Sequence, residues 1–203
     1  MMATTHVLAG VVIGLAAVAV GPVESGLVVA AAGLGGLVPD FDILGAHRKT
    51  LHFPVYGSLA AAATTLLAAL LPTLPTVALA VFLLAAAVHA VSDLFGGGLS
   101  LRPWEATSDR GVYEHLRGRW HPPRRVIRYD GAPEDALLAG ALAVPSLVTL
   151  DGLGRWVVVG LVAVSLVYAA TRRLLVEGGE ALVRRLPSWV LRLVPETLIE
   201  DLR

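Results

Sequence analysis

Long stretches without a charged side chain dominate the first half of this sequence and restrict what the chain can fold into. Between Met1 and Phe95 only six residues are Asp, Glu, Lys or Arg. Over all 203 residues, 56% are hydrophobic and 16% are charged, whereas a soluble domain carries about 25% charged residues. A water-soluble globule does not fit this composition. Lipid, which requires no polar protein surface, is the expected solvent.

The sequence contains six apolar stretches, and each is interpreted as a helix. Spanning the hydrocarbon takes about 20 helical residues, with a range of about 17–25, so the first, third, fourth and sixth fit and the other two are short. The second must be locally compressed, re-entrant or placed in a thinned membrane. We predict an all-α, polytopic membrane protein with six transmembrane helices, within a range of four to six. The stretches are 4–21, 26–38, 54–71, 76–95, 136–150 and 153–171.

The basic residues give the chain a predicted orientation. With six spans, fifteen of the sixteen Lys and Arg residues fall on one side, and only Arg155 lies opposite. The positive-inside rule then predicts a multi-pass protein of the cell (inner or plasma) membrane with both termini in the cytoplasm. Gly10 and Gly14 form a GxxxG pair on the first stretch, which predicts close helix packing.

Two polar regions complete the predicted organisation around the membrane core 1–95 and the two later spans in 136–171. Segment 96–135 carries thirteen charged residues and is expected to be a cytoplasmic insertion, in which Asp130-Gly131 predicts a tight turn. His115 and His121 belong to this insertion and are interpreted as ordinary polar residues. The tail 172–203 alternates apolar residues with arginines, which predicts an amphipathic helix on the membrane surface.

Seven ionisable residues lie in or beside the apolar stretches of the first half, where a charged group is costly and rarely without function. The predicted topology brings all seven to the cytoplasmic face, although it was assigned without them. Structural explanations exist for several of them: His6 as an interfacial cap, His47 as a loop residue, and Asp40 and Asp42 as caps of the loop. The seven residues are His6, Asp40, Asp42, His47, His52, His89 and Asp93.

Spacing sharpens the case for a metal. His89 and Asp93 are four residues apart on one helix face, which allows them to share a metal or to form a buried pair that only joins helices. Asp40 and Asp42 would point to one side of an extended backbone. Imidazole and carboxylate without cysteine suit zinc, with manganese or iron as alternatives. Seven potential ligands are too many for one tetrahedral ion. They indicate either two ions, or one ion whose ligands are contacted by further carboxylates.

Four short motifs in this order resemble the YdjM-like family of membrane-bound metal-dependent hydrolases. They are the early histidine, GGLVPDFD (35–42), HRKTLHFP (47–54) and HAVSD (89–93), within residues 1–104. That family is similar to zinc phospholipases C and P1-type nucleases. The resemblance implies metal ligands at His6, Asp40, His52, His89 and Asp93, and extends to Asp42 and His47. Phe53 departs from the family, in which a small hydroxyl residue commonly follows the histidine that corresponds to His52.

These observations predict a metal-dependent hydrolase at the cytoplasmic membrane face, with a phosphoester of a lipid or another amphiphile as substrate. Asp42 or Asp40 would accept a proton from water, and Arg48 and Lys49 would hold a phosphate. Membrane lipid is the expected partner, and no nucleic acid is expected. The alternative is a non-catalytic membrane adaptor or regulatory protein with a structural metal site, which recruits a cytoplasmic partner through 96–135.

Overall fold

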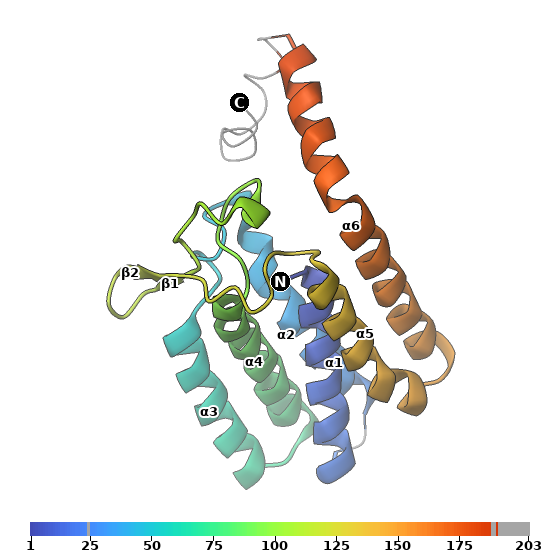
Figure 1. Cartoon of the computed structure of the whole chain (residues 1–203). Helices are drawn as coiled ribbons and strands as arrows, with labels where there is room; N and C mark the ends of the chain where they lie inside the picture. The colour runs from blue at the N-terminus through green and yellow to red at the C-terminus, as the bar shows by residue number, and fades with distance from the viewer. Residues whose placement is uncertain (24, 188–189, 191–203) are drawn as a thin grey trace.

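The computed structural model describes residues 1–23, 25–187 and 190 and is mainly helical (Figure 1). All six apolar stretches form helices, which confirms the predicted all-α fold class. A short two-stranded hairpin is the one sheet in the described part of the chain. The helices are α1 (Ala3–Val20), α2 (Gly26–Leu37), α3 (Pro54–Leu70), α4 (Leu74–Ser92), α5 (Pro133–Thr149) and α6 (Gly152–Arg185).

Four helices are long and apolar enough to cross a membrane, which lies within the predicted range of four to six. They are α1, α4, α6 and a combined segment Gly26–Ile43. That segment explains how the short second stretch gains length, because α2 continues directly into the 3-10 helix η1 (Val38–Leu44). Helix α3 is apolar but shorter. Large apolar side chains on the outside, such as Leu59 at 62% and Val148 at 78% exposure, match a lipid surrounding.

The helices pack as a layered bundle in the spatial order α3, α4, α2, α1, α5, α6. Val28 and Ala32 of α2 and Val81 of α4 form one buried cluster, and Leu8 of α1 joins α5 and α6 in another. Glycines bring the first two helices into contact, as the GxxxG pair predicts. A Cβ atom on Gly10 would lie 2.2 Å from the carbonyl oxygen of Ala32.

The charged insertion between α4 and α5 lies over one end of the bundle (Figure 1). It contains two further 3-10 turns, η2 (Asp93–Phe95) and η3 (Pro103–Glu105), and the hairpin of β1 (Val112–Glu114) and β2 (Arg119–His121). Asp130 and Gly131 lie in a turn, as predicted, and Gly131 has a φ of +79° that favours glycine.

The predicted boundary between the last span and the tail does not coincide with the end of a helix. Helix α6 runs without a break through residue 171 to Arg185, so residues 172–185 extend the last apolar helix and do not begin a separate surface helix. Arg102 and the Trp104 ring contact this extension through Glu180 and Arg173. The rest of the predicted amphipathic tail, including Trp189, Arg192 and Leu193, lies outside the described residues.

Candidate metal centre

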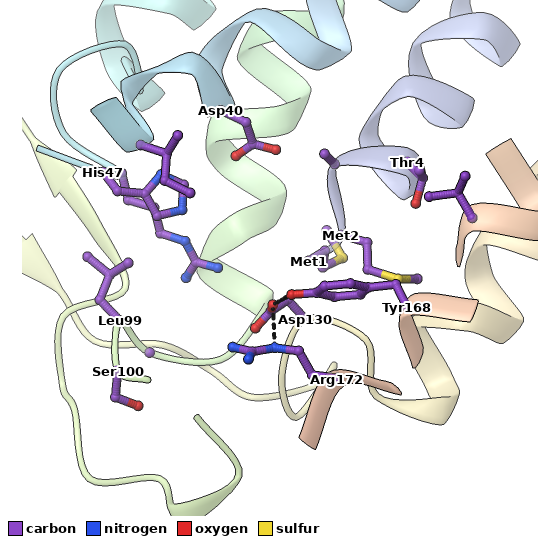
Figure 2. A pocket seen from close by; sticks show the side chains of 15 residues that line it. Met1, Met2, Thr4, Asp40, His47, Leu99, Ser100, Asp130, Tyr168 and Arg172 are labelled. Carbon is purple, nitrogen blue, oxygen red and sulfur yellow. Dashed lines mark hydrogen bonds and ion pairs between the residues drawn. The ribbon is translucent and has the colours of Figure 1, made fainter. Parts of the chain in front are cut away.

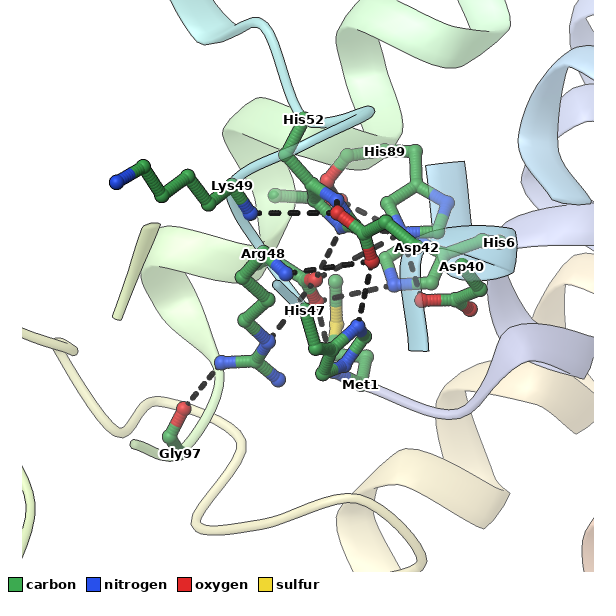
Figure 3. A network of polar contacts seen from close by, with 12 residues as sticks. Met1, His6, Asp40, Asp42, His47, Arg48, Lys49, His52, His89 and Gly97 are labelled. Atoms are coloured by element: carbon green, nitrogen blue, oxygen red, sulfur yellow. Dashed lines mark hydrogen bonds and ion pairs between the residues drawn. The ribbon is translucent and has the colours of Figure 1, made fainter. Parts of the chain in front are cut away.

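The seven ionisable residues that the sequence singles out converge at the end of the bundle that the insertion covers. His6 lies in the first turn of α1, and His89 and Asp93 lie at the end of α4. Asp40 and Asp42 belong to η1, and His47 and His52 lie in the loop between η1 and α3. Figure 2 shows Asp40 and His47 on the wall of a cavity beside this cluster, and Figure 3 shows the polar network itself.

Four of these residues could hold one metal ion: Asp40, His52, His89 and Asp93. Each offers one nitrogen or oxygen atom, and the four atoms lie within 4.8 Å of one another. His52, His89 and Asp93 are at most 1% exposed. The Asp40 side chain is 20% exposed and forms the open side of the group. These residues come from three separate segments, so only the tertiary fold assembles them.

The hydrogen bonds of the two histidines leave one ring nitrogen of each facing the other. His89 Nδ1 lies 2.6 Å from the carbonyl oxygen of Gly36, which can only accept, so Nδ1 is the protonated nitrogen. His52 Nδ1 donates in the same way to Asp42 Oδ2 at 2.9 Å. In neutral rings both Nε2 atoms therefore carry a lone pair, and they lie 3.2 Å apart. This arrangement orients two imidazoles as metal ligands.

A divalent cation fits this donor set. Asp93 Oδ2 lies 3.3 Å from His52 Nε2 and 3.6 Å from His89 Nε2, and Asp40 Oδ1 lies 3.4 Å from His89 Nε2. Two imidazole nitrogens and two carboxylate oxygens thus lie around one buried space, and the Met1 ammonium and Arg48 already neutralise part of the negative charge through their ion pairs with Asp93. Two imidazoles and two carboxylates suit zinc and similar divalent metals. The donor set does not by itself select one metal.

The electrostatics around His52 favour positive charge. Burial lowers the pKa of this imidazole, but its hydrogen bonds with Asp42 and Asp93 outweigh burial, and the net effect raises the pKa. The same carboxylates that attract a proton also attract a divalent cation. His52 is therefore placed where a metal ion and protons compete for the same nitrogen.

Asp42 organises the loop and is not one of the four cluster residues, contrary to its predicted role as ligand or base. The sequence interpretation assumed an extended backbone, but Asp40 and Asp42 lie in a 3-10 helix, where residues two apart point in different directions. Both Asp42 oxygens already accept hydrogen bonds from the following loop. Oδ1 accepts from His47 Nδ1 and Arg48 N, and Oδ2 accepts from Lys49 N, Leu51 N and His52 Nδ1.

His6 and His47 flank the cluster without being among its four residues. The His6 ring stacks on His89 with 3.6 Å between ring centroids, and its Nε2 lies 3.1 Å from Asp93 Oδ1. The His47 ring is 30% exposed and bonds Asp42 Oδ1 at 2.8 Å. His6 thus contacts the opposite oxygen of a candidate ligand, whereas His47 is separated from the cluster by a carboxylate. Both residues lie beside the four-residue group, in positions typical of residues that orient metal ligands.

The two predicted phosphate-binding residues lie in different places. The Arg48 guanidinium is nearly buried, donates to the carbonyl oxygen of Gly97 and has its Nε 3.3 Å from Asp93 Oδ2. This Nε is buried without a hydrogen-bond partner. Lys49 points elsewhere: its Nζ lies 4.4 Å from the centre of the Tyr113 ring on the hairpin. The geometry therefore keeps Arg48 as a candidate for anion binding and removes Lys49.

A cavity of about 470 Å³ opens beside the cluster (Figure 2). Asp40, His47 and Arg48 line its wall on the cluster side. On the other wall Asp130 accepts hydrogen bonds from Tyr168 and Arg172 of α6. The cavity is thus polar at two ends, and the remaining lining is mainly apolar: Met1, Met2, Ala3, Ile43, Leu99 and Val164, with Thr4, Gly98 and Ser100.

Sequence reasoning missed several partners of the site. Ser92 places its Oγ 3.4 Å from His6 Nδ1, and the Gly36 carbonyl orients His89. Both lie inside motifs that the sequence analysis singled out, and this position within a motif was the signal that could have identified them. No local signal identified Asp130, Tyr168 and Arg172, because segments more than 30 residues apart form that wall.

In comparisons with protein-family models, curated proteins and solved structures, nothing matches this chain. The candidate centre therefore rests on its own geometry. A buried group of two histidines and two aspartates, at one end of a bundle of membrane-type helices, defines a possible metal site beside an open cavity.

Proposed function

We propose that this chain is a membrane-embedded, metal-dependent hydrolase of a phosphoester carried by a lipid or another amphiphile. The single observation that carries the proposal is the pair of opposed Nε2 atoms of His52 and His89, which meet two carboxylates beside an open cavity. A purely structural buried network would be expected to pair each donor with an acceptor. Two acceptors in contact are instead an arrangement that either a metal ion or an extra proton completes.

Asp40, His52, His89 and Asp93 would hold the ion. When bound, a divalent metal supplies Lewis-acid polarisation of a phosphoryl oxygen and makes a neighbouring water more acidic. Asp40 is the ligand residue that lines the cavity, so its second carboxylate oxygen would accept a proton from the attacking water. The water oxygen forms the new bond to phosphorus, the bond to the ester oxygen breaks, and that oxygen leaves with a proton.

The proposed choice of a phosphoester rests on Arg48. Its guanidinium is nearly buried, has Nε 3.3 Å from Asp93 Oδ2 without a hydrogen bond to it, and lines the cavity next to the cluster. A guanidinium suits the planar, two-oxygen edge of a phosphate better than an ammonium does. The cavity supports the choice of an amphiphile as substrate. It has charged residues at two ends and an apolar lining between them, and it lies between membrane-type helices.

The proposed location is the cytoplasmic face of the cell membrane. The insertion with seven arginines covers the same end of the bundle as the cluster, and the positive-inside rule assigns such an end to the cytoplasm. This function also agrees with the activity that the resemblance to the YdjM-like family implies. A site at headgroup level would reach the phosphate of a lipid without removing the lipid from the bilayer.

The test combines metal analysis with hydrolysis. Protein purified in detergent without chelator should contain at least about one equivalent of zinc, manganese or iron. After loading with each metal, it should release phosphate or an alcohol from phosphatidic acid, lysophosphatidic acid or a fluorescent phosphodiester lipid. His89→Ala and Asp93→Ala should lose both properties, whereas His121→Ala, a histidine outside the cluster, should keep the metal. Equal metal content in wild type and Asp93→Ala would overturn the proposed centre.

A metal-loaded protein that hydrolyses none of these esters would instead favour the structural-metal alternative. In cells, that alternative expects the biological role to survive when the metal ligands are replaced. The proposed hydrolase expects the role to be lost with His89→Ala and Asp93→Ala, at unchanged protein level in the membrane.

A further inference from the structure

The hairpin of the charged insertion, residues 112–121, has no part in the proposed chemistry. Its strands pair Val112 with His121 and Glu114 with Arg119. Val112 is fully buried at the base, whereas the tip from Leu116 to Arg119 is exposed. Figure 1 shows the hairpin projecting sideways from the bundle, above the start of α3. A short hairpin of this kind is marginally stable alone, so its contacts decide what it does.

The base of the hairpin is attached to the loop that carries the candidate ligands. The Tyr113 N–H donates to the Arg48 carbonyl oxygen at 3.0 Å, and Lys49 lies over the Tyr113 ring. The His115 ring lies 4.6 Å from the ring of Phe53, the residue that follows His52. The hairpin is thus fastened beside the cluster at its base and reaches away from it at its tip.

The tip combines positive charge with apolar surface. Leu116 is 58% exposed, and the side chains of Arg117 and Arg119 are 63% and 56% exposed. Residues 112–121 contain two arginines and one glutamate, Glu114, which lies 3.7 Å from Arg117 and 3.8 Å from Arg119, so the hairpin keeps one excess positive charge. Trp120 lies beside Tyr113 and Arg110 on this hairpin. Leucine and tryptophan together with arginine are typical of segments that lie in the interface of an anionic membrane.

We propose that the tip of this hairpin lies in the headgroup layer and binds anionic phospholipid. Two observations favour lipid over an acidic protein surface. The tip projects above the start of α3, an apolar helix with exposed leucines, so it lies at the height where a surrounding bilayer would end. Its exposed leucine also suits the boundary between headgroups and acyl chains, whereas the arginines suit lipid phosphates. The inference does not depend on hydrolase activity.

Lipid binding by the tip would affect the position of the loop that carries candidate ligands. A tip held by lipid would restrain Tyr113, and through it the backbone at Arg48, in the loop between Asp42 and His52. The hairpin would therefore position this loop as a peripheral support and would not contact a substrate.

The chain contains no cysteine, so one introduced cysteine carries a unique label. The test places a nitroxide at Leu116→Cys and reconstitutes the full chain in nanodiscs of phosphatidylcholine, with or without phosphatidylglycerol. Access of a water-soluble paramagnetic reagent to the label should fall in the anionic discs, and access of oxygen should rise. Replacing Arg117 and Arg119 by alanine should lower the ratio of inserted to free tip by about fivefold per arginine.

Asp109→Cys provides a matched label in the same insertion, because its side chain is 90% exposed and lies outside the hairpin. Its accessibility should be similar in both kinds of disc. Three outcomes would overturn the proposal: no change at Leu116→Cys, an equal change at Asp109→Cys, or a change that the arginine replacements leave intact. If the label at Leu116→Cys becomes protected only when an acidic protein is added, the partner of the tip is an acidic protein and not anionic lipid.

Discussion

His52 Nε2 and His89 Nε2 lie 3.2 Å apart with the opposite nitrogen of each ring bonded to an acceptor. Neither nitrogen can satisfy the other while both rings are neutral. The centre therefore holds either a metal or an extra proton. Since a metal must displace that proton, affinity depends on pH and on both rings.

The first prediction concerns the two histidines. His52→Ala and His89→Ala should each weaken zinc binding by more than about 100-fold, because each removes a direct donor. Isothermal titration of protein in detergent with zinc measures the change, and His121→Ala should bind zinc like the wild type. Binding should also weaken as the solution becomes acidic, because protons compete for the ring nitrogens. Unchanged affinity in either alanine variant would contradict the assignment.

The second prediction separates Asp42 from Asp93. Asp42→Asn keeps the shape of the side chain but loses the charge that orients His52, so zinc affinity should fall by about 10- to 100-fold with the stoichiometry retained. Asp93→Asn removes a ligand oxygen and should abolish stoichiometric binding. If the two variants behave alike, Asp42 belongs among the ligands after all.

The third prediction concerns close helix packing near the site. A Cβ atom on Gly35 would lie 2.1 Å from the carbonyl oxygen of Phe82, in the backbone of α4. Gly35→Ala should therefore destabilise the fold by about 1–3 kcal/mol and lower the melting temperature measured by circular dichroism in detergent. Gly140→Ala in α5 is the control, because nothing lies within 4 Å of its added Cβ. That change should leave the melting temperature unchanged or raise it.

The fourth prediction is an acid transition of the hairpin. Glu114 is nearly buried, and its hydrogen bond from His121, which outweighs burial, lowers the pKa of the carboxyl. The ionised carboxylate thus stabilises the hairpin above the ordinary Glu pKa of about 4.3. This contribution disappears as the pH falls through the lower value of the folded state. A nitroxide at Leu116→Cys should become more mobile in this acid range.

Glu114→Gln serves as the control for this transition, because glutamine does not titrate. Its label mobility should be flat over the same acid range. An acid transition that persists in Glu114→Gln would contradict the role of the Glu114 carboxylate.

The helices were predictable because their signal is local. Apolar runs of 12 to 20 residues, bounded by Gly, Pro, Ser and Thr, indicate helix ends whatever the chain packs against. The i, i+4 spacing of His89 and Asp93 likewise placed both on one helix face. Helix α6 shows the limit: its end at Arg185 was not predicted, and its extension contacts Arg102 and Trp104, which lie about 70 residues away in the sequence.

The sequence by itself determined that the chain is helical and suited to lipid, and it predicted that the aspartates and histidines of the first half gather at one end. Those properties follow from hydropathy and from which helix end each residue occupies. Only the tertiary structure decided that Asp40 joins His52, His89 and Asp93 while Asp42 serves the loop. The physical reason is that a ligand set depends on angles and hydrogen-bond partners between distant segments. The 3-10 turn at Asp40 and the Gly36 carbonyl behind His89 fix those angles.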